Sequence, residues 1–127
     1  TNKIMINGTS GETGDSEPMS ITDANGVMYF SAFDGTAPGL WKSDGTPGGT
    51  VLVKNIYPGG GSGCLGNLKS VNDMLFFYGN EANYGGELWR SDGTAGGTTL
   101  VKDINPGPGS SGISELTVVN NVLYFRA

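Results

Sequence analysis

Three Asp-Gly-Thr triplets, which start at Asp34, Asp44 and Asp92, place a carboxylate and a hydroxyl group two residues apart. Clustered carboxylate and hydroxyl oxygens are the ligands that a hard cation such as calcium prefers. The same triplet is a turn signal, because the Asp carboxylate accepts backbone N–H bonds and glycine supplies a positive φ angle. Neither an EF-hand loop nor a calcium-binding nonapeptide is present. We therefore expect structural turns at Asp44-Gly45 and Asp92-Gly93, with calcium binding by Asp44 and Asp92 as the alternative.

The sequence contains few residues that could form a catalytic site. The chain has no histidine and one cysteine, so it can form neither a Ser-His-Asp triad nor a Cys/His metal site. Paired carboxylates hydrolyse glycosides, but several of the 12 acidic residues recur at equivalent turn positions, whereas a catalytic pair is normally unique. The glycine-rich run 58–63 lacks the Lys-Ser/Thr of a phosphate-binding loop. We predict that the protein is not an enzyme and has no cofactor apart from the calcium alternative.

A tandem repeat organises these residues. Trp41 and Trp89 are related by an offset of 48 (89 − 41), and that offset aligns 41–79 with 89–127 without a gap. Of these 39 positions, 21 are identical, which indicates duplication. Asn25 and Asn72 mark an earlier partial copy at an offset of 47 (72 − 25). Because both tryptophans hold a fixed position within apolar strands, we expect them to pack between repeats rather than to bind a sugar ring.

Each repeat has the pattern of four short strands. In the second repeat we predict strands at residues 68–71, 74–78, 87–91 and 99–104. Asn72 and Asp73 tolerate positive φ and therefore predict a tight hairpin turn. The 23 glycines argue against long helices. Four strands in about 48 residues is the size of a propeller blade. The sequence therefore predicts an all-β fold of β-propeller-type, four-stranded antiparallel blades.

The octapeptide ELWRSDGT, from Glu87 to Thr94, resembles the signature of the bacterial ELWxxDGT repeat family. The run LVKDINPG that starts at Leu100 is also similar to this family. The resemblance covers the chain apart from the segment 1–20, and the first copy departs from the signature at Gly39, where the family has Glu. It implies propeller blades of a large secreted or surface-attached bacterial protein, and it supplies no catalytic residues.

Composition narrows the partners and the location. The net charge is −5 and the seven basic residues are scattered, so no basic stripe is available for nucleic acid. No apolar run approaches the roughly 18 residues of a membrane span. An acidic chain with only 15% charged residues fits an extracellular or cell-surface bacterial protein.

The predicted strands do not add up to a closed ring. One strand near Ile4, two sets of four and two ending at Ala127 give 11 strands, or about 2.75 repeats. Propellers close with ~4–8 blades, so other copies or a longer parent chain must complete the ring or array. The predicted units are a degenerate partial repeat at 1–20, repeats at 21–57 and 68–105, and a partial repeat at 116–127.

Two functions fit these patterns. The first is a non-enzymatic structural or adhesive module that assembles with copies of itself through blade edges, with the Ile4 strand completing a neighbour's last blade. The alternative is a carbohydrate-binding, lectin-like propeller with sites repeated at loops 33–38 and 80–86. Its predicted ligand-binding residues are Phe33, Asp34, Tyr84 and Glu87.

Overall fold

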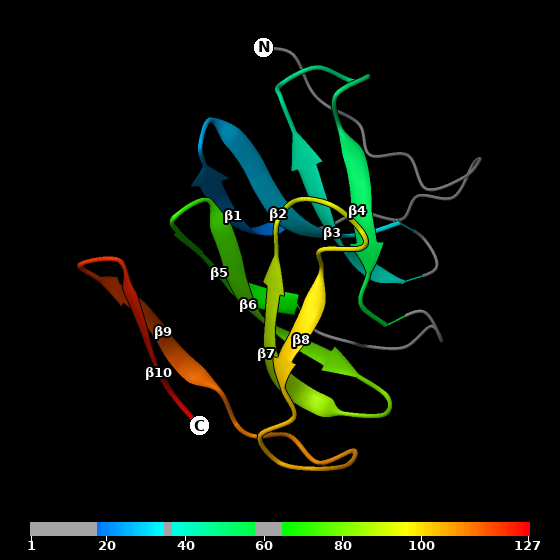
Figure 1. Cartoon of the computed structure of the whole chain (residues 1–127). Helices are drawn as coiled ribbons and strands as arrows, with labels where there is room; N and C mark the ends of the chain where they lie inside the picture. Colours follow the sequence, from blue (N-terminus) through cyan, green and yellow to red (C-terminus); the bar gives the residue numbers. More distant parts are fainter. Residues whose placement is uncertain (1–17, 35–36, 58–64) are drawn as a thin grey trace.

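The computed structural model describes residues 18–34, 37–57 and 65–127, which form ten β-strands (Figure 1). The first sheet holds β1 (Met19–Ala24), β2 (Val27–Phe33), β3 (Pro38–Ser43) and β4 (Val51–Asn55). The second sheet holds β5 (Leu65–Val71), β6 (Met74–Glu81), β7 (Gly85–Ser91) and β8 (Thr99–Lys102). The terminal hairpin holds β9 (Ser114–Val119) and β10 (Val122–Arg126). The strand predicted near Ile4 lies outside the described residues.

Both complete sheets are antiparallel meanders in which each strand pairs with the next one in the chain. The prediction of an all-β fold with four-stranded antiparallel sheets is therefore confirmed. Within the described residues the sheets do not close into a barrel or a ring (Figure 1). Nor do these residues include a helix of the length and apolarity needed to cross a membrane.

The hairpin turns at the start of each unit use residues that tolerate the left-handed backbone region. Asn72 and Asp73 have φ angles of 48° and 65°, as predicted for a tight turn. Asn25-Gly26 joins β1 to β2, and Asn120-Asn121 joins β9 to β10, with both central φ angles positive in each turn. These two-residue connections match the right-handed twist of the strands and fix the register of each first strand pair.

The four strands predicted for the second repeat are all present, with small shifts at their ends. β5 begins at Leu65 rather than residue 68, and β8 ends at Lys102 rather than residue 104. β8 stops earlier because the backbone N–H groups of Ile104 and Asn105 donate to a side-chain carboxylate instead of a neighbouring strand.

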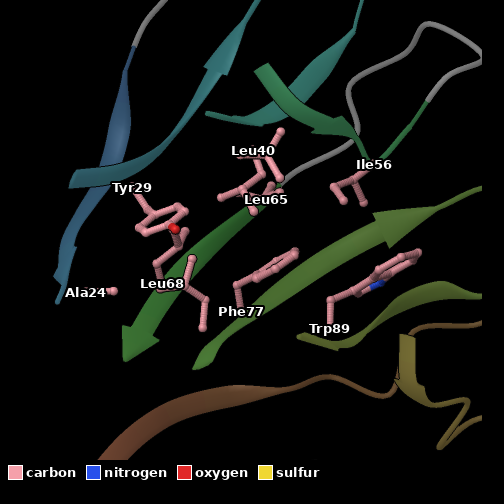
Figure 2. Close-up of a cluster of buried hydrophobic side chains, with 10 residues drawn as sticks. Ala24, Tyr29, Leu40, Ile56, Leu65, Leu68, Phe77 and Trp89 are labelled. Carbon is pink, nitrogen blue, oxygen red and sulfur yellow. The ribbon is translucent and has the colours of Figure 1, made fainter. Parts of the chain in front are cut away.

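The main core lies between the first and second sheets. In Figure 2, Tyr29, Leu40 and Ile56 of the first repeat point toward Phe77 and Trp89 of the second sheet. Leu40 and Phe77 are fully buried. Burying apolar side chains of this size contributes about 1.5–3 kcal/mol each, so this face-to-face packing is the main force that joins the two sheets.

A second, smaller cluster covers the opposite face of the second sheet. Ile113, just before β9, and Leu116 of β9 pack with Leu88, and Phe76 and Tyr78 lie against them. β6 therefore has apolar neighbours on both faces, as its continuous apolar sequence predicts.

The first strands of the three units lie in series. β1 contacts β5, and β5 contacts β9. The Thr22 hydroxyl donates a hydrogen bond of 2.8 Å to the Leu68 carbonyl oxygen across the first of these contacts. The three units therefore succeed one another in one direction, each packed by its face on the next.

Phe77 and Phe125 test how much the stability depends on this face-to-face packing. They hold the same repeat position (125 − 77 = 48), but Phe77 is 0% exposed and Phe125 is 40% exposed. We expect Phe77→Ala to lower the free energy of unfolding by about 3–5 kcal/mol, measured by urea denaturation. Phe125→Ala should cost far less. Equal losses would contradict a core centred between the first and second sheets.

Candidate functional site

The Asp-Gly-Thr turn of the second sheet is held by a dense set of side-chain hydrogen bonds. The Asp92 carboxylate accepts from the Thr94 amide at 2.9 Å and from the Thr94 hydroxyl at 2.6 Å. The Thr94 hydroxyl accepts from the Gly97 amide at 2.9 Å. Ser91 and Thr98 share a hydroxyl hydrogen bond of 2.7 Å that ties the two ends of the turn together. The polar side chains of the turn thus bond to one another and to the backbone of the turn.

The turn of the first sheet repeats this network with the same partners at the repeat offset. Asp44 accepts from the Thr46 amide and hydroxyl at 2.9 and 2.7 Å, and the Thr46 hydroxyl accepts from Gly49 at 2.9 Å. Ser43 and Thr50 share the matching hydroxyl bond of 2.7 Å. Since the two networks agree bond for bond, the turn is a fixed part of the repeat.

The hydrogen bonds from Thr46 and Thr94 lower the pKa of Asp44 and of Asp92 below the usual value. Both carboxylates are therefore ionised near neutral pH. Their contribution to the fold is present above the ordinary Asp pKa and is lost as the pH falls through the lowered value. Among the described residues no group of three Asp, Glu or Cys side chains is placed to hold a metal ion. Calcium binding at Asp44 and Asp92 stays a prediction.

The two turns differ in what covers them. Lys42 of β3 donates to the Gly93 carbonyl oxygen, and Lys54 of β4 donates to the Thr98 carbonyl oxygen, both at 3.0 Å. Gly93 and Thr98 are buried in consequence. In the first turn the corresponding Gly45 is exposed and Thr50 is half-buried. Cations on the face of one sheet thus bind the turn of the next sheet.

Tyr29 completes the contact between the first sheet and this turn. A Cβ atom built on Gly93 would overlap the Tyr29 hydroxyl, so the turn approaches the first sheet too closely for a side chain. Burial raises the pKa of Tyr29, and the nearby negative charge of Asp92 adds to the effect. Because the phenol stays protonated, its O–H lies beside the turn as a neutral group.

Glu87 opens the ELW motif and is fully buried. Its carboxylate oxygens accept hydrogen bonds from the Ile104 amide at 3.0 Å and the Asn105 amide at 3.4 Å. A buried carboxylate that accepts backbone N–H groups fixes the chain where it leaves β8. Ligand binding by Glu87, which we predicted from the sequence, stays untested, and the geometry shows a structural use of its oxygens.

In the first sheet, no carboxylate of the described residues binds the backbone where the chain leaves β4. Gly39 stands where the second sheet has Glu87, and the Asn55 side chain fills the space beside it, 2.8 Å from where a glycine Cβ would lie. The Ile56 amide then donates to the Pro38 carbonyl oxygen at 3.4 Å. A backbone acceptor thus replaces the side-chain acceptor, so the first sheet has no need of a carboxylate at Gly39.

The other predicted ligand-binding residues lie in the loops that join the second and third strands. Phe33 is 42% exposed at the end of β2, and Asp34 accepts from the Ala37 amide at 2.9 Å. Tyr84 is 41% exposed between β6 and β7. Phe33 and Tyr84 belong to different sheets, and no contact brings them together in the described residues.

The two tryptophans occupy the same strand position but different surroundings. Trp89 is 7% exposed and lies in the core between the sheets, as Figure 2 shows. Trp41 is half-buried on the face of the first sheet that points away from the second. The difference follows from which face of each sheet has another sheet packed on it.

No family model matches this chain, and no curated protein or solved structure shows significant similarity to it. The resemblance to ELWxxDGT repeats is therefore an interpretation of the motifs themselves.

Two adjacent glycines test whether the turn network holds the second sheet. A Cβ on Gly97 would overlap the Asp92 carboxylate, whereas a Cβ on Gly96 meets no atom within 4 Å. We expect Gly97→Ala to lower Tm by several degrees in a thermal scan, since the Asp92 hydrogen bonds must shift. Gly96→Ala is the matched control and should leave Tm nearly unchanged. Equal effects of the two variants would contradict a structural role for the Asp92 network.

Glu87→Gln tests the buried carboxylate. The amide group keeps one acceptor and turns a donor toward backbone N–H groups, so we expect a loss of about 1–3 kcal/mol in the free energy of unfolding. Glu81→Gln is the control, because Glu81 ends β6 and its carboxylate accepts hydrogen bonds only from Asn83. Full stability of Glu87→Gln by urea denaturation would show that the two amides do not need the carboxylate.

Proposed function

We propose that this chain is a non-enzymatic structural or adhesive repeat module of a secreted or cell-surface bacterial protein, and that it assembles through the edges of its sheets. One observation carries the proposal. The terminal hairpin has two strands where each preceding unit has four, and β10 has no neighbouring strand on its outer side among the described residues (Figure 1). Unpaired N–H and C=O groups along such an edge are a template for a further strand.

The terminal hairpin is also the most apolar exposed part of the described chain. Four of its large apolar side chains are at least 40% exposed, namely Val119, Val122, Tyr124 and Phe125. Phe77, the counterpart of Phe125, is fully buried in the second sheet. This exposed apolar surface supports the proposal that another polypeptide covers the edge.

The propeller interpretation rests on the way in which the units succeed one another. Their first strands lie in series, and their faces pack on one another in the same order. Propellers are built from four-stranded meanders arranged in this way and close with ~4–8 blades. Two sheets and a hairpin are too few to close, so copies of the chain or a longer parent chain would complete the ring or array.

The absence of catalysis is proposed from repetition. The acidic turn residues occur twice with the same partners, and both copies are engaged in holding a turn. Glu87, the one fully buried carboxylate among the described residues, bonds to backbone amides. An acid–base pair would need carboxylates set apart from such structural use. The secreted location is proposed from composition and from the ELWxxDGT resemblance.

Carbohydrate binding is the second candidate, and the equivalent loops favour it. Phe33 and Tyr84 are both exposed at about two fifths of their surface, each beside a carboxylate that orders its own loop. Exposed aromatic rings stack on sugars, and loops repeated in every unit would give several weak sites that act together.

Tyr124 and Tyr84 form a matched pair that separates the two candidates. Light scattering at several concentrations should show that the unsubstituted chain is a discrete multimer or a growing polymer. Tyr124→Lys should shift the mass toward the monomer, since charge at an edge blocks strand addition. Tyr84→Lys should leave the mass unchanged.

The same pair gives the opposite result if the protein is a lectin. Carbohydrate recognition would be favoured if the unsubstituted chain is a monomer that binds immobilised glycans and if Tyr84→Lys removes that binding. A folded monomer at all concentrations would overturn assembly through the chain's own edges.

A further inference from the structure

One part of the second sheet is bare although its counterpart in the first sheet is covered. We name Arg90, Val101 and Lys102 the outer patch. On β7 the patch lies beyond Leu88, which packs with Ile113 and Leu116. Val101 is 43% exposed, whereas Val53, its counterpart in the first sheet (101 − 53 = 48), is 7% exposed in the core between the sheets.

A β-bulge places the members of the patch together. In the pairing of β7 with β8 the register shifts between Leu88 and Trp89, so Val101 is the extra residue next to Lys102. The same bulge occurs between β3 and β4, where it holds Val53 beside Lys54. A bulge re-aims side chains that strict alternation would place on opposite faces. The repeat therefore builds the same apolar and cationic pair on both sheets.

The two cations of the outer patch, Arg90 and Lys102, have counterparts in the first sheet that bind the turn of the second sheet. Lys42 and Lys54 hold these positions in the first sheet and donate to the carbonyl oxygens of Gly93 and Thr98. The side chains of Arg90 and Lys102 are exposed. Arg90 pairs through its backbone with Phe76 and Thr99, but its guanidinium makes no hydrogen bond or ion pair with another described residue. Arginine and lysine both donate to carbonyl oxygens, so the second sheet offers the same recognition without an occupant among the described residues.

The space beside the patch defines what fits there. The terminal hairpin already fills the inner half of this face, through Ile113 and Leu116. A complete four-stranded sheet of a second copy would collide with it. In both complete sheets a third and a fourth strand follow the second. Two strands paired in the same way with the free edge of β10 would bring their turn to the outer patch, as the turn of the second sheet reaches Lys42 and Lys54. In the second sheet the strands in that position are β7 and β8, joined by the Ser-Asp-Gly-Thr turn.

We infer that the outer patch is the docking site for a β-hairpin of this same repeat type, recognised through two turn carbonyl groups and an apolar strand. Arg90 donates to the carbonyl oxygen of the turn glycine, and Lys102 donates to that of the threonine that ends the turn. Val101 packs on the incoming strand pair as Val53 packs on the second sheet. This inference rests on the proposed assembly function and names the partner that completes its third unit.

A peptide with the sequence of residues 80–105 is the probe, because Ala127 aligns with Gly79 and residue 80 is the next position of the repeat (127 − 79 = 48). Calorimetric titration into the full chain should show saturable binding with one peptide per chain. The double variant Arg90→Ala/Lys102→Ala should bind about tenfold more weakly or worse, which corresponds to about 1.4 kcal/mol. Lys69→Ala, an exposed lysine on β5, is the control and should bind normally.

Peptide variants test whether the turn is what the patch recognises. A peptide with Gly97→Ala should bind more weakly than one with Gly96→Ala, since only the first substitution disturbs the turn carbonyls. Equal binding of the two peptides, or undiminished binding to the double variant, would overturn the inference.

A covalent version keeps the test decisive if the free peptide aggregates. Adding the sequence of residues 80–105 after Ala127 should raise Tm and protect the β10 amides from hydrogen exchange, and Arg90→Ala/Lys102→Ala should remove most of this gain. No gain in the extended chain would overturn the inference. The outcomes of the two proposals can be distinguished. If the unsubstituted chain is a monomer that binds the hairpin peptide, only self-assembly is contradicted. If it is a multimer and does not bind the hairpin peptide, only the docking site is contradicted.

Discussion

Each sheet of this protein depends on the sheet that packs against its face. A four-stranded antiparallel meander of this size buries little by itself, and the second sheet keeps Leu75 and Phe77 dry only because Tyr29 and Leu40 lie across from them. This face-to-face packing fixes what each residue can be. It requires a glycine where the turn meets Tyr29, and it makes a partly buried lysine tolerable because turn carbonyls receive its ammonium group. Stacking of units is therefore the constraint from which the local details follow.

Much of the local structure could be predicted from the sequence, because the signals are short-range. Asn72-Asp73 predicted a tight turn, and the alternation of apolar runs with glycine-rich gaps predicted four strands in each repeat. The Asp92-Gly93-Thr94 triplet predicted a turn for the reason that the hydrogen bonds show. Strand ends were less accurate, since β8 stops where the Glu87 carboxylate takes over the backbone amides. That exchange depends on a side chain from a different strand and leaves no local signature.

The sequence pattern did not predict which residues make contact between neighbouring units. Lys42 and Lys54 looked like scattered surface charge, and only the stacking of sheets brings their ammonium groups to Gly93 and Thr98. A signal did exist, because both positions carry a cation again in the next repeat, at Arg90 and Lys102. A charge that recurs at a fixed repeat position indicates that this position contacts a neighbouring unit. The different burial of Trp41 and Trp89 could not be foreseen, because it depends on which faces are covered rather than on the residue.

The terminal hairpin has a consequence for how the chain unfolds. In an array where each unit touches only its neighbours, cooperativity is carried by the interfaces, and a unit with one interface opens more often than a unit with two. β9 and β10 rest on the second sheet through a small cluster and expose most of their other apolar surface. Among the described residues, the hairpin and the first sheet each have one packed face, and the second sheet has two. The amides of the second sheet are therefore the ones that exchange most slowly with solvent.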